Sequence, residues 1–333
     1  MMDKVNVAVI GVGAMGKNHA RVFSELENSN LVAICDSNEQ VGKEIADKFK
    51  AKFYSDLKEM LEKENIDAIS ICVPTKLHKE TTLSIINKKI HVLVEKPIAT
   101  TIEEAKEIID EAEKNNAKLM IGHIERFNPI IIELKKRIKN NELGKVFLVK
   151  SERFSPFPKR VIDVGVTIDL SVHDIDIMQH LLESKVKSVY GANSQKVHSS
   201  QEDLMTSILK FKNETIGIIN CNWITPKIVR EITVIGEKGM FKADYLTQEL
   251  HFFKNEFTDK YIDWEKRRLN VIPGDIIKID IEKKEPLKNE LQSFIDCITD
   301  DSDPAITGQD GLESLNIALK FLESSKNNEV IDL

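Results

Sequence analysis

The sequence has little of what marks several special classes of protein. Its four cysteines are scattered and form no CxxC or Cys/His spacing, which argues against a disulfide scaffold or a zinc module. Gly and Pro number only 14 and 9, too few for a collagen-like or low-complexity chain. No run approaches the roughly 20 apolar residues of a membrane-spanning helix. The first apolar run ends at Gly11 and is too short for the hydrophobic core of a signal peptide. We therefore expect a cytoplasmic protein without a membrane partner.

The sequence carries a net negative charge, which gives the protein no overall positive electrostatic potential. Lys and Arg total 47 against 54 Asp and Glu, which gives a net charge of −7. A chain of this sign has no global attraction to nucleic acid, so we expect no nucleic-acid partner. Hydrophobic residues make up 41% and charged residues 30%, which suits a chain with a buried core. The length of 333 residues predicts two domains.

Short apolar runs alternate with stretches of helical spacing through residues 1–122. The apolar runs suit buried parallel strands, and the alternation is typical of a doubly wound sheet. We therefore predict an α/β Rossmann dinucleotide-binding domain over residues 1–122, with Ser55 and Thr101 capping two of its helices. The expected strands are 5–10, 31–35, 68–73, 91–94 and 118–121, and the expected helices are 16–26, 38–49, 56–64, 80–87 and 102–115.

The pattern changes over residues 123–333, where strand-like segments follow one another closely. Close spacing favours antiparallel pairing, so this part is predicted to be an α+β domain with an open, mainly antiparallel sheet. We expect it to bind substrate, and its two terminal helices, within 286–325, could pack on either domain. The expected strands are 146–154, 186–192, 206–211, 215–223, 231–236 and 239–244, and the expected helices are 129–139 and 168–182.

A glycine fingerprint follows the first predicted strand and opens the first predicted helix. Gly11, Gly13 and Gly16 form GxGxxG, and Asp36 ends the next strand 20 residues beyond Gly16. The glycines allow a tight turn, close approach of a pyrophosphate and close packing of helix on strand, while the helix N-terminus favours phosphate. Asp36 can accept hydrogen bonds from a ribose, so NAD is preferred over NADP, although Ser37 could tolerate a phosphate. Val12, Ala14 and Met15 complete the expected cofactor loop.

Two further segments end predicted strands at the edge where ligands of doubly wound sheets bind. Pro74, Thr75 and His78 follow the third of the expected strands, and we expect them to contact the cofactor, although a polar contact at a helix start explains His78 equally well. Glu95-Lys96-Pro97 ends the next strand. A lysine there can hydrogen-bond a substrate hydroxyl beside a nicotinamide, and the alternative is a surface ion pair.

Asp169 and His173 stand four residues apart and would share one face of a helix. A neutral imidazole can take a hydroxyl proton near neutral pH, and the carboxylate can orient that hydroxyl or stabilise the imidazolium. The alternatives are a structural histidine, or a metal site of a hydrolase that adds Asp174 or Asp176. No third convergent histidine can be identified, so we expect no metal.

Basic and amide side chains near the predicted domain junction are candidates for ligand contacts. Arg126 and Asn128 could reach cofactor and substrate. Arg153, Lys159 and Arg160 could meet an anionic group, or could simply be solvated. The predicted cofactor contacts thus include Glu95, Lys96, Pro97 and Arg126, and the predicted substrate contacts are Lys96, Asn128, Arg153, Arg160, Asp169 and His173.

Together these segments resemble the Gfo/Idh/MocA family of nicotinamide-dependent oxidoreductases along essentially the whole chain. The resemblance rests on the glycine loop 11–16, the EKP segment 95–97, the RFNP segment 126–129 and the D-x-x-x-H spacing. It implies a Rossmann domain followed by an open sheet domain, in homodimers or homotetramers that associate through the sheets. It also implies that the catalytic group consists of Lys96, Asp169 and His173.

Within this family, the segments GHIERFNP and DVGVTIDLSVHDIDI look most like the UDP-N-acetylglucosamine 3-dehydrogenases. The likeness implies NAD-dependent oxidation of the 3-hydroxyl of a nucleotide sugar to a 3-keto product, with an aminotransferase as a downstream partner in amino-sugar biosynthesis. Another polyol, an inositol or a free sugar, is the alternative substrate. A non-catalytic NAD(H)-binding sensor is the alternative from a different class, and the intact candidate catalytic residues count against it.

Overall fold

The computed structural model describes residues 4–158, 164–197, 200–257 and 271–333. Contacts between residues divide the chain into two compact units. The N-terminal unit comprises Met1–Ile124 together with Glu285–Asn316, and the sheet unit comprises Glu125–Lys284 with Ile317–Leu333. The segment that rejoins the N-terminal unit carries the first of the two terminal helices, for which the sequence left both partners open.

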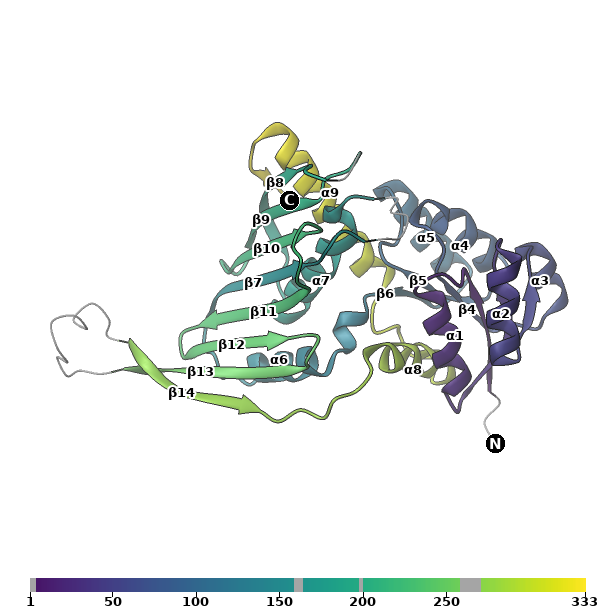
Figure 1. Cartoon of the computed structure of the whole chain (residues 1–333), viewed down its shortest axis with the longest axis horizontal. Helices are drawn as coiled ribbons and strands as arrows, with labels where there is room; N and C mark the ends of the chain where they lie inside the picture. Colours follow the sequence, from purple (N-terminus) through teal and green to yellow (C-terminus); the bar gives the residue numbers. More distant parts are fainter. Residues whose placement is uncertain (1–3, 159–163, 198–199, 258–270) are drawn as a thin grey trace. The chain divides into compact units, whose positions relative to one another are not determined.

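The N-terminal unit is built on a six-stranded parallel sheet in the order β3-β2-β1-β4-β5-β6 (Figure 1). This is the strand order of a dinucleotide-binding Rossmann domain, which confirms the predicted fold of this part. Its central strands are buried along nearly their whole length, because helices cover both faces of such a sheet. The strands are β1 (Val5–Ile10), β2 (Ser29–Cys35), β3 (Lys52–Tyr54), β4 (Ala68–Ile71), β5 (His91–Glu95) and β6 (Leu119–Gly122).

The helices of this unit begin where side chains can accept hydrogen bonds from first-turn amides. Asn38 and Thr101 do so for α2 and α5. The predicted cap Ser55 is wrong by one residue, because α3 is capped by Asp56, whose side chain accepts the N–H of Glu59. The partial positive charge at a helix N-terminus also stabilises a carboxylate there. The helices are α1 (Gly16–Glu25), α2 (Glu39–Phe49), α3 (Leu57–Lys63), α4 (His78–Ile86), α5 (Ile102–Lys114) and α8 (Pro286–Thr299), and α8 packs against α1.

The sheet unit holds a nine-stranded sheet in the order β14-β13-β12-β11-β7-β10-β9-β8-β15. All neighbours are antiparallel except β7 and β10, so the sheet is mixed and mainly antiparallel, as predicted in outline. Three of its strands, β13, β14 and β15, were not predicted. The strands are β7 (Val146–Phe154), β8 (Val186–Ser194), β9 (Leu204–Phe211), β10 (Ile216–Asn222), β11 (Val229–Gly236), β12 (Gly239–Asp244), β13 (Glu249–Phe257), β14 (Val271–Ile279) and β15 (Ile331–Asp332).

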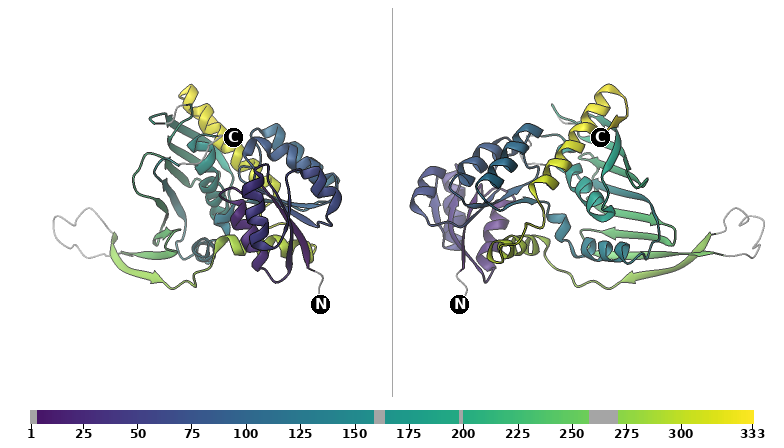
Figure 2. Two further views of the ribbon diagram at one scale, coloured as in Figure 1. Left: turned by 45° about the vertical axis from the view of Figure 1, so that its right-hand side comes forward. Right: turned by 180° about the vertical axis from the view of Figure 1, so that it is seen from behind.

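Within the described ranges, helices lie on one face of this sheet and none covers the other face (Figure 2). Strand β9 shows the consequence, because its residues alternate between buried and exposed along the whole strand. The helices are α6 (Pro129–Lys139) and α7 (Val172–Leu182), with the end of α9 (Gly308–Asn327). The helix predicted over 168–182 differs in its first turn, where Thr167–Ser171 is π-helical. In the part of the chain that the structure describes, no helix is both long and apolar enough to cross a membrane.

Candidate functional site

The glycine loop between β1 and α1 has two glycines that the fold itself requires and one that it does not. Gly11 has φ +79°, and its N–H donates to Cys35 O at 2.8 Å. A Cβ at Gly16 would come within 1.8 Å of the Gly11 carbonyl oxygen, so the third glycine permits the helix to pack on the loop. A Cβ at Gly13 would meet nothing within 4 Å. The backbone is therefore bare toward open space at the position where a dinucleotide pyrophosphate needs close approach.

Asp36 ties the second strand to this loop. Its Oδ2 accepts the N–H of Val12 at 2.7 Å, and its Oδ1 accepts the N–H of Asn38 at 2.8 Å. Each carboxylate oxygen can accept more than one hydrogen bond, so the half-buried Asp36 retains capacity for ribose hydroxyls. Ser37 beside it is exposed, as are Gly13 and Ala14, while Met15 is half-buried. The residues present thus fit NAD, with a carboxylate where the adenosine ribose binds in this fold.

The turns after β4 and β5 are joined by a buried histidine. His78 is 1% exposed, and its Nδ1 lies 2.9 Å from Pro97 O while its Nε2 lies 3.0 Å from Val73 O. Thr75 is 7% exposed in the turn that follows Pro74. The sequence left two roles open for His78, and the structure gives its ring a polar contact to both turns. A contact with the cofactor remains a prediction for Pro74, Thr75 and His78.

Glu95, directly before Lys96, is paired with a histidine that the sequence analysis did not single out. Nε2 of His19, on α1, lies 3.0 Å from Glu95 Oε1, and Nδ1 lies 2.8 Å from Ser70 Oγ on β4. His19 is fully buried and Glu95 is 7% exposed. The only signal was a histidine on the buried face of α1, at helical spacing from Gly16.

The protonation of this pair follows from its contacts. Burial acts to raise the pKa of Glu95, but the hydrogen bond and charge of His19, with smaller contributions from Lys96 and His78, bring it below its usual value. Burial acts to lower the pKa of His19, but Cys72 and Glu95 bring it well above 6.5. Lys96 itself is half-buried at the end of β5. Glu290 of α8 is fully buried nearby, with a carboxylate oxygen within 4.8 Å of the ligand atoms of His19 and Glu95.

In the sheet unit, the two candidate catalytic residues lie at the start of α7. Asp169 is 5% exposed in the π-helical turn, and its N–H donates to Gly165 O at 2.9 Å. His173 is half-buried on the first turn of α7. π-helical turns inside helices are frequent at functional sites, because the extra residue re-aims neighbouring side chains. The catalytic roles of both residues remain predictions.

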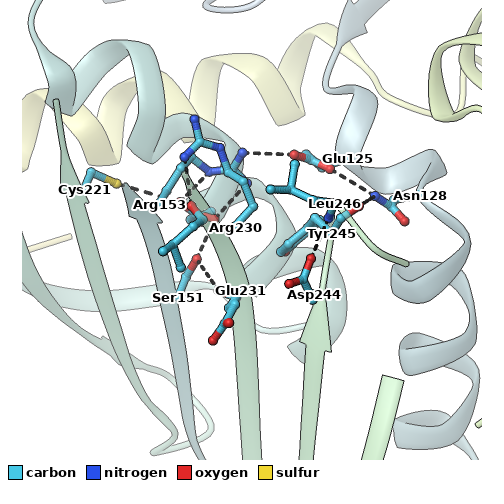
Figure 3. A network of polar contacts seen from close by, with 12 residues as sticks. Glu125, Asn128, Ser151, Arg153, Cys221, Arg230, Glu231, Asp244, Tyr245 and Leu246 are labelled. Atoms are coloured by element: carbon cyan, nitrogen blue, oxygen red, sulfur yellow. Dashed lines mark hydrogen bonds and ion pairs between the residues drawn. The ribbon is translucent and has the colours of Figure 1, made fainter. Parts of the chain in front are cut away.

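Two arginines expected to meet ligands are instead bound by carboxylates of the same unit. Arg126 donates from Nε to Asp176 Oδ2 at 2.8 Å and from Nη2 to Oδ1 at 2.5 Å. Arg153 is 3% exposed and donates from Nε and Nη2 to Asp174, both at 3.1 Å, and from Nη1 to Glu125 at 2.9 Å (Figure 3). These pairs engage the two aspartates of the alternative metal set. Lys159 and Arg160 lie outside the described residues.

Asn128 also has a local role, because it caps α6. Its Oδ1 accepts the N–H of Ile130 at 3.4 Å, and its Nδ2 donates to Tyr245 O at 3.3 Å (Figure 3). Arg153 in turn lies 5.4 Å from the centre of the Tyr245 ring. The sequence gave no sign of these partners, since Asp174 and Tyr245 lie 21 and 92 residues from Arg153. Contacts of this range depend on the tertiary fold.

Comparison with known proteins agrees with these features. The profile of the oxidoreductase family with an NAD-binding Rossmann fold (Gfo/Idh/MocA) matches residues 5–123, and the profile of its C-terminal α/β domain matches residues 135–333. The myo-inositol 2-dehydrogenase of Thermotoga maritima is 26% identical over 97% of this chain and 98% of its own length. The UDP-N-acetylglucosamine 3-dehydrogenase of Acidithiobacillus ferrooxidans is 25% identical over 89% of this chain and 90% of its own.

A solved structure of the A. ferrooxidans enzyme has a TM-score of 0.84 to this chain at 24% identity, and covers 98% of this chain and 99% of its own. It shows the shared fold. The two profile matches together span both structural units, and the glycine loop with Asp36 has the geometry that an NAD-binding domain requires. The chain therefore belongs to the Gfo/Idh/MocA family of oxidoreductases, NAD-dependent dehydrogenases that act on CH–OH groups.

Proposed function

We propose that this protein oxidises the 3-hydroxyl of a nucleotide sugar, with UDP-N-acetylglucosamine as substrate and its 3-keto form as product. The observation that carries the proposal is the likeness to the A. ferrooxidans UDP-N-acetylglucosamine 3-dehydrogenase over about nine-tenths of both chains. The segments 122–129 and 163–177 of the sequence support it independently. A ketone at C3 is a substrate for transamination, so an aminotransferase would consume the product.

The proposed catalytic group is Lys96, Asp169 and His173. His173 takes the proton of the substrate hydroxyl, Asp169 orients the imidazole or the hydroxyl, and Lys96 donates a hydrogen bond to the same oxygen. Bound NAD supplies the hydride acceptor. The glycine loop and Asp36 hold the pyrophosphate and the ribose. Arg126 and Arg153 act in this proposal by fixing α7, the helix that carries His173, through Asp176 and Asp174.

A second candidate substrate is an inositol. The T. maritima relative with this activity is as similar to the chain as the nucleotide-sugar dehydrogenase is, and covers slightly more of it. Both candidates present a secondary alcohol, so the same three side chains serve either oxidation. They differ in the diphosphate, which only the nucleotide sugar carries.

A substrate panel tests the proposal. The purified protein is incubated with NAD and either UDP-N-acetylglucosamine or myo-inositol, with an aminotransferase and glutamate present to remove a ketone, and NADH absorbance and product mass are followed. We expect turnover with the nucleotide sugar. Lys96→Met should abolish turnover but retain NAD binding, whereas Lys106→Met, at an exposed position of α5, should match the parent. Turnover with inositol alone contradicts the substrate, and parental turnover by Lys96→Met contradicts the catalytic assignment.

We also propose that the open face of the sheet mediates homodimers or homotetramers. Ile208 of β9 and Ile216 of β10 point away from the covered face and are 48% and 43% exposed, and Ile276 of β14, on the same face, is 64% exposed. Apolar side chains on the open face of a sheet favour burial against another sheet. Light scattering of the parent and of Ile208→Lys tests this proposal. It predicts a lower molar mass for the variant, with fewer subunits per particle than in the parent.

A further inference from the structure

The segment that carries Lys96 is held on both sides by buried histidines. On the N-terminal side, His19 Nε2 lies 3.0 Å from Glu95 Oε1, and the other oxygen of Glu95 accepts the N–H of Lys96 at 3.3 Å. On the C-terminal side, His78 Nδ1 lies 2.9 Å from Pro97 O. The two rings come from different helices, α1 and α4. The backbone around Lys96 is thus tied to the helix of the glycine loop and to the turn after β4.

The contacts of His78 define its protonation state. Both acceptors, Pro97 O and Val73 O, are backbone carbonyl oxygens, which cannot donate. A neutral imidazole has one N–H, so it could satisfy only one carbonyl and would turn a lone pair toward the other. Only the imidazolium makes both hydrogen bonds. The ring is 1% exposed, so water does not replace a missing donor.

We propose that His78 is an imidazolium that bridges the turns after β4 and β5, and that together with His19 it positions Lys96 for catalysis. This inference rests on the proposed function, because Lys96 is the residue whose chemistry is being positioned. Both histidines are positioning residues and need no contact with substrate. The proposal explains why a Rossmann domain buries two histidines beside one strand end.

The surrounding charges can support two buried imidazolium rings. Glu95 interacts with the charges of both rings and of Lys96, while Cys72 after β4 and Glu290 of α8 lie beside His19. The carboxylates of Glu95 and Glu290 thus offset part of the positive charge of the two imidazolium rings and Lys96. His19, Glu95 and Glu290 also have the spacing of a metal-ligand set. The 3.0 Å hydrogen bond between His19 and Glu95, however, uses the ring nitrogen that a metal would bind, so we interpret the group as an ion pair.

Ring-nitrogen NMR of the full-length protein tests the charge of His78 without any turnover. The protein is labelled with ¹⁵N-histidine, and the His78 signals are identified by their loss in His78→Gln. We expect both nitrogens of His78 to carry hydrogen at about pH 7.5, a pH at which an unperturbed histidine is mostly neutral. An unprotonated nitrogen at this pH overturns the proposal. The result stands even if no tested substrate is turned over, so the two proposals fail separately.

Two substitutions separate the two hydrogen bonds of His78. Asparagine places its amide near the Nδ1 position and keeps the donor to Pro97, whereas glutamine reaches the Nε2 position and keeps the donor to Val73. We expect His78→Gln to lower kcat about tenfold or more, and His78→Asn to lower it less, with the NAD dissociation constant within about threefold in both. His91→Gln, at the opposite end of β5, is the matched control and should leave kcat unchanged.

The same logic applies to His19. Glutamine keeps a donor near Glu95, so His19→Gln should retain more kcat than His19→Leu at similar NAD affinity. Equal kcat in the parent and in all four variants contradicts a positioning role. So does a parallel loss of NAD affinity and kcat, which would indicate a merely structural role.

Discussion

Replacing Asp174 by asparagine removes one charge from an ion pair whose side chains are 0% and 4% exposed. Asp174 accepts hydrogen bonds from Arg153 at 3.1 Å twice and from Ser151 at 2.6 Å. An asparagine of the same shape offers one acceptor oxygen and turns an N–H₂ toward these donors. Arg153 would stay buried, and among the described residues Glu125, at 2.9 Å, would remain as its counter-charge.

The cost follows from the enclosure of the pair. Breaking a buried ion pair by removing one partner destabilises a protein by about 3–5 kcal/mol, because the remaining charge is left in a low dielectric. Glu125 offsets part of this loss, so we expect about 3 kcal/mol for Asp174→Asn. Removing Arg153 as well eliminates the uncompensated charge. Arg153→Met/Asp174→Asn should therefore be no less stable than the single variant.

Urea unfolding followed by tryptophan fluorescence measures this cost in the right part of the protein. Trp223 of the sheet unit is 2% exposed, so its signal reports the unfolding of that unit. Trp264, the other tryptophan of the sequence, lies outside the described residues. Glu214→Gln, which breaks the exposed pair with Lys210, is the matched control and should leave the midpoint unchanged. The reasoning is refuted if Asp174→Asn unfolds at the parental urea midpoint. It is also refuted if Arg153→Met lowers the free energy of unfolding of Asp174→Asn further, as an independent substitution would.

Further predictions follow from other contacts. Gly13→Ala should keep the parental melting temperature but bind NAD at least about tenfold more weakly. Gly16→Ala should lower the melting temperature, because a Cβ at Gly16 meets the chain itself whereas a Cβ at Gly13 does not. Calorimetry with and without NAD distinguishes the two variants. Folding raises the pKa of His19 and lowers that of Glu95, so their ion pair contributes its full stabilisation of the folded state between about pH 4.5 and 6.5. This contribution is lost as the pH rises through the folded-state pKa of His19, or as it falls through the folded-state pKa of Glu95. The difference in melting temperature between the parent and His19→Leu should therefore be largest near pH 5.5 and shrink in alkali, and a difference that grows with pH contradicts the pairing. Burial raises the pKa of Cys35 and of Cys297 to about 11, so iodoacetamide near pH 8 should label the half-buried Cys72 first, and peptide mass mapping that finds Cys35 or Cys297 labelled first contradicts the described burial.

The parts of the fold that the sequence predicted correctly depend on local patterns. The glycine loop and Asp36 lie where the strand–turn–helix pattern placed them, because turn, strand and helix start are all encoded within a few residues. Thr101 caps α5 as predicted, because its Oγ1 accepts the N–H of Glu104, while the Glu104 carboxylate accepts hydrogen bonds from the neighbouring Thr100. For α3, Asp56 is the cap where Ser55 was predicted. Both adjacent side chains carry an oxygen that can accept a first-turn N–H, and the backbone geometry decides which of them does.

The parts that were missed depend on contacts between distant segments. The sequence predicted ligand contacts for Arg126 and Arg153 but not their ion pairs, because the partners Asp176 and Asp174 lie 50 and 21 residues away. His19 could be placed on a helix but not against Glu95, 76 residues further on. Strand β14 was missed because its residues do not alternate between buried and exposed, since the adjacent Ile276 and Ile277 are both exposed. Which long-range partners a side chain meets is a property of the packed units.

Isotope transfer tests the central claim most directly. The protein is incubated with NAD and UDP-N-acetylglucosamine that carries deuterium only at C3 of the sugar, and the mass of the nicotinamide ring is measured. Our account predicts that the reduced cofactor gains one deuterium in the parent and that Lys96→Met forms no reduced cofactor. Reduced cofactor that forms without deuterium, or a sugar that keeps its label while the parent is fully active on another alcohol, would contradict oxidation at C3.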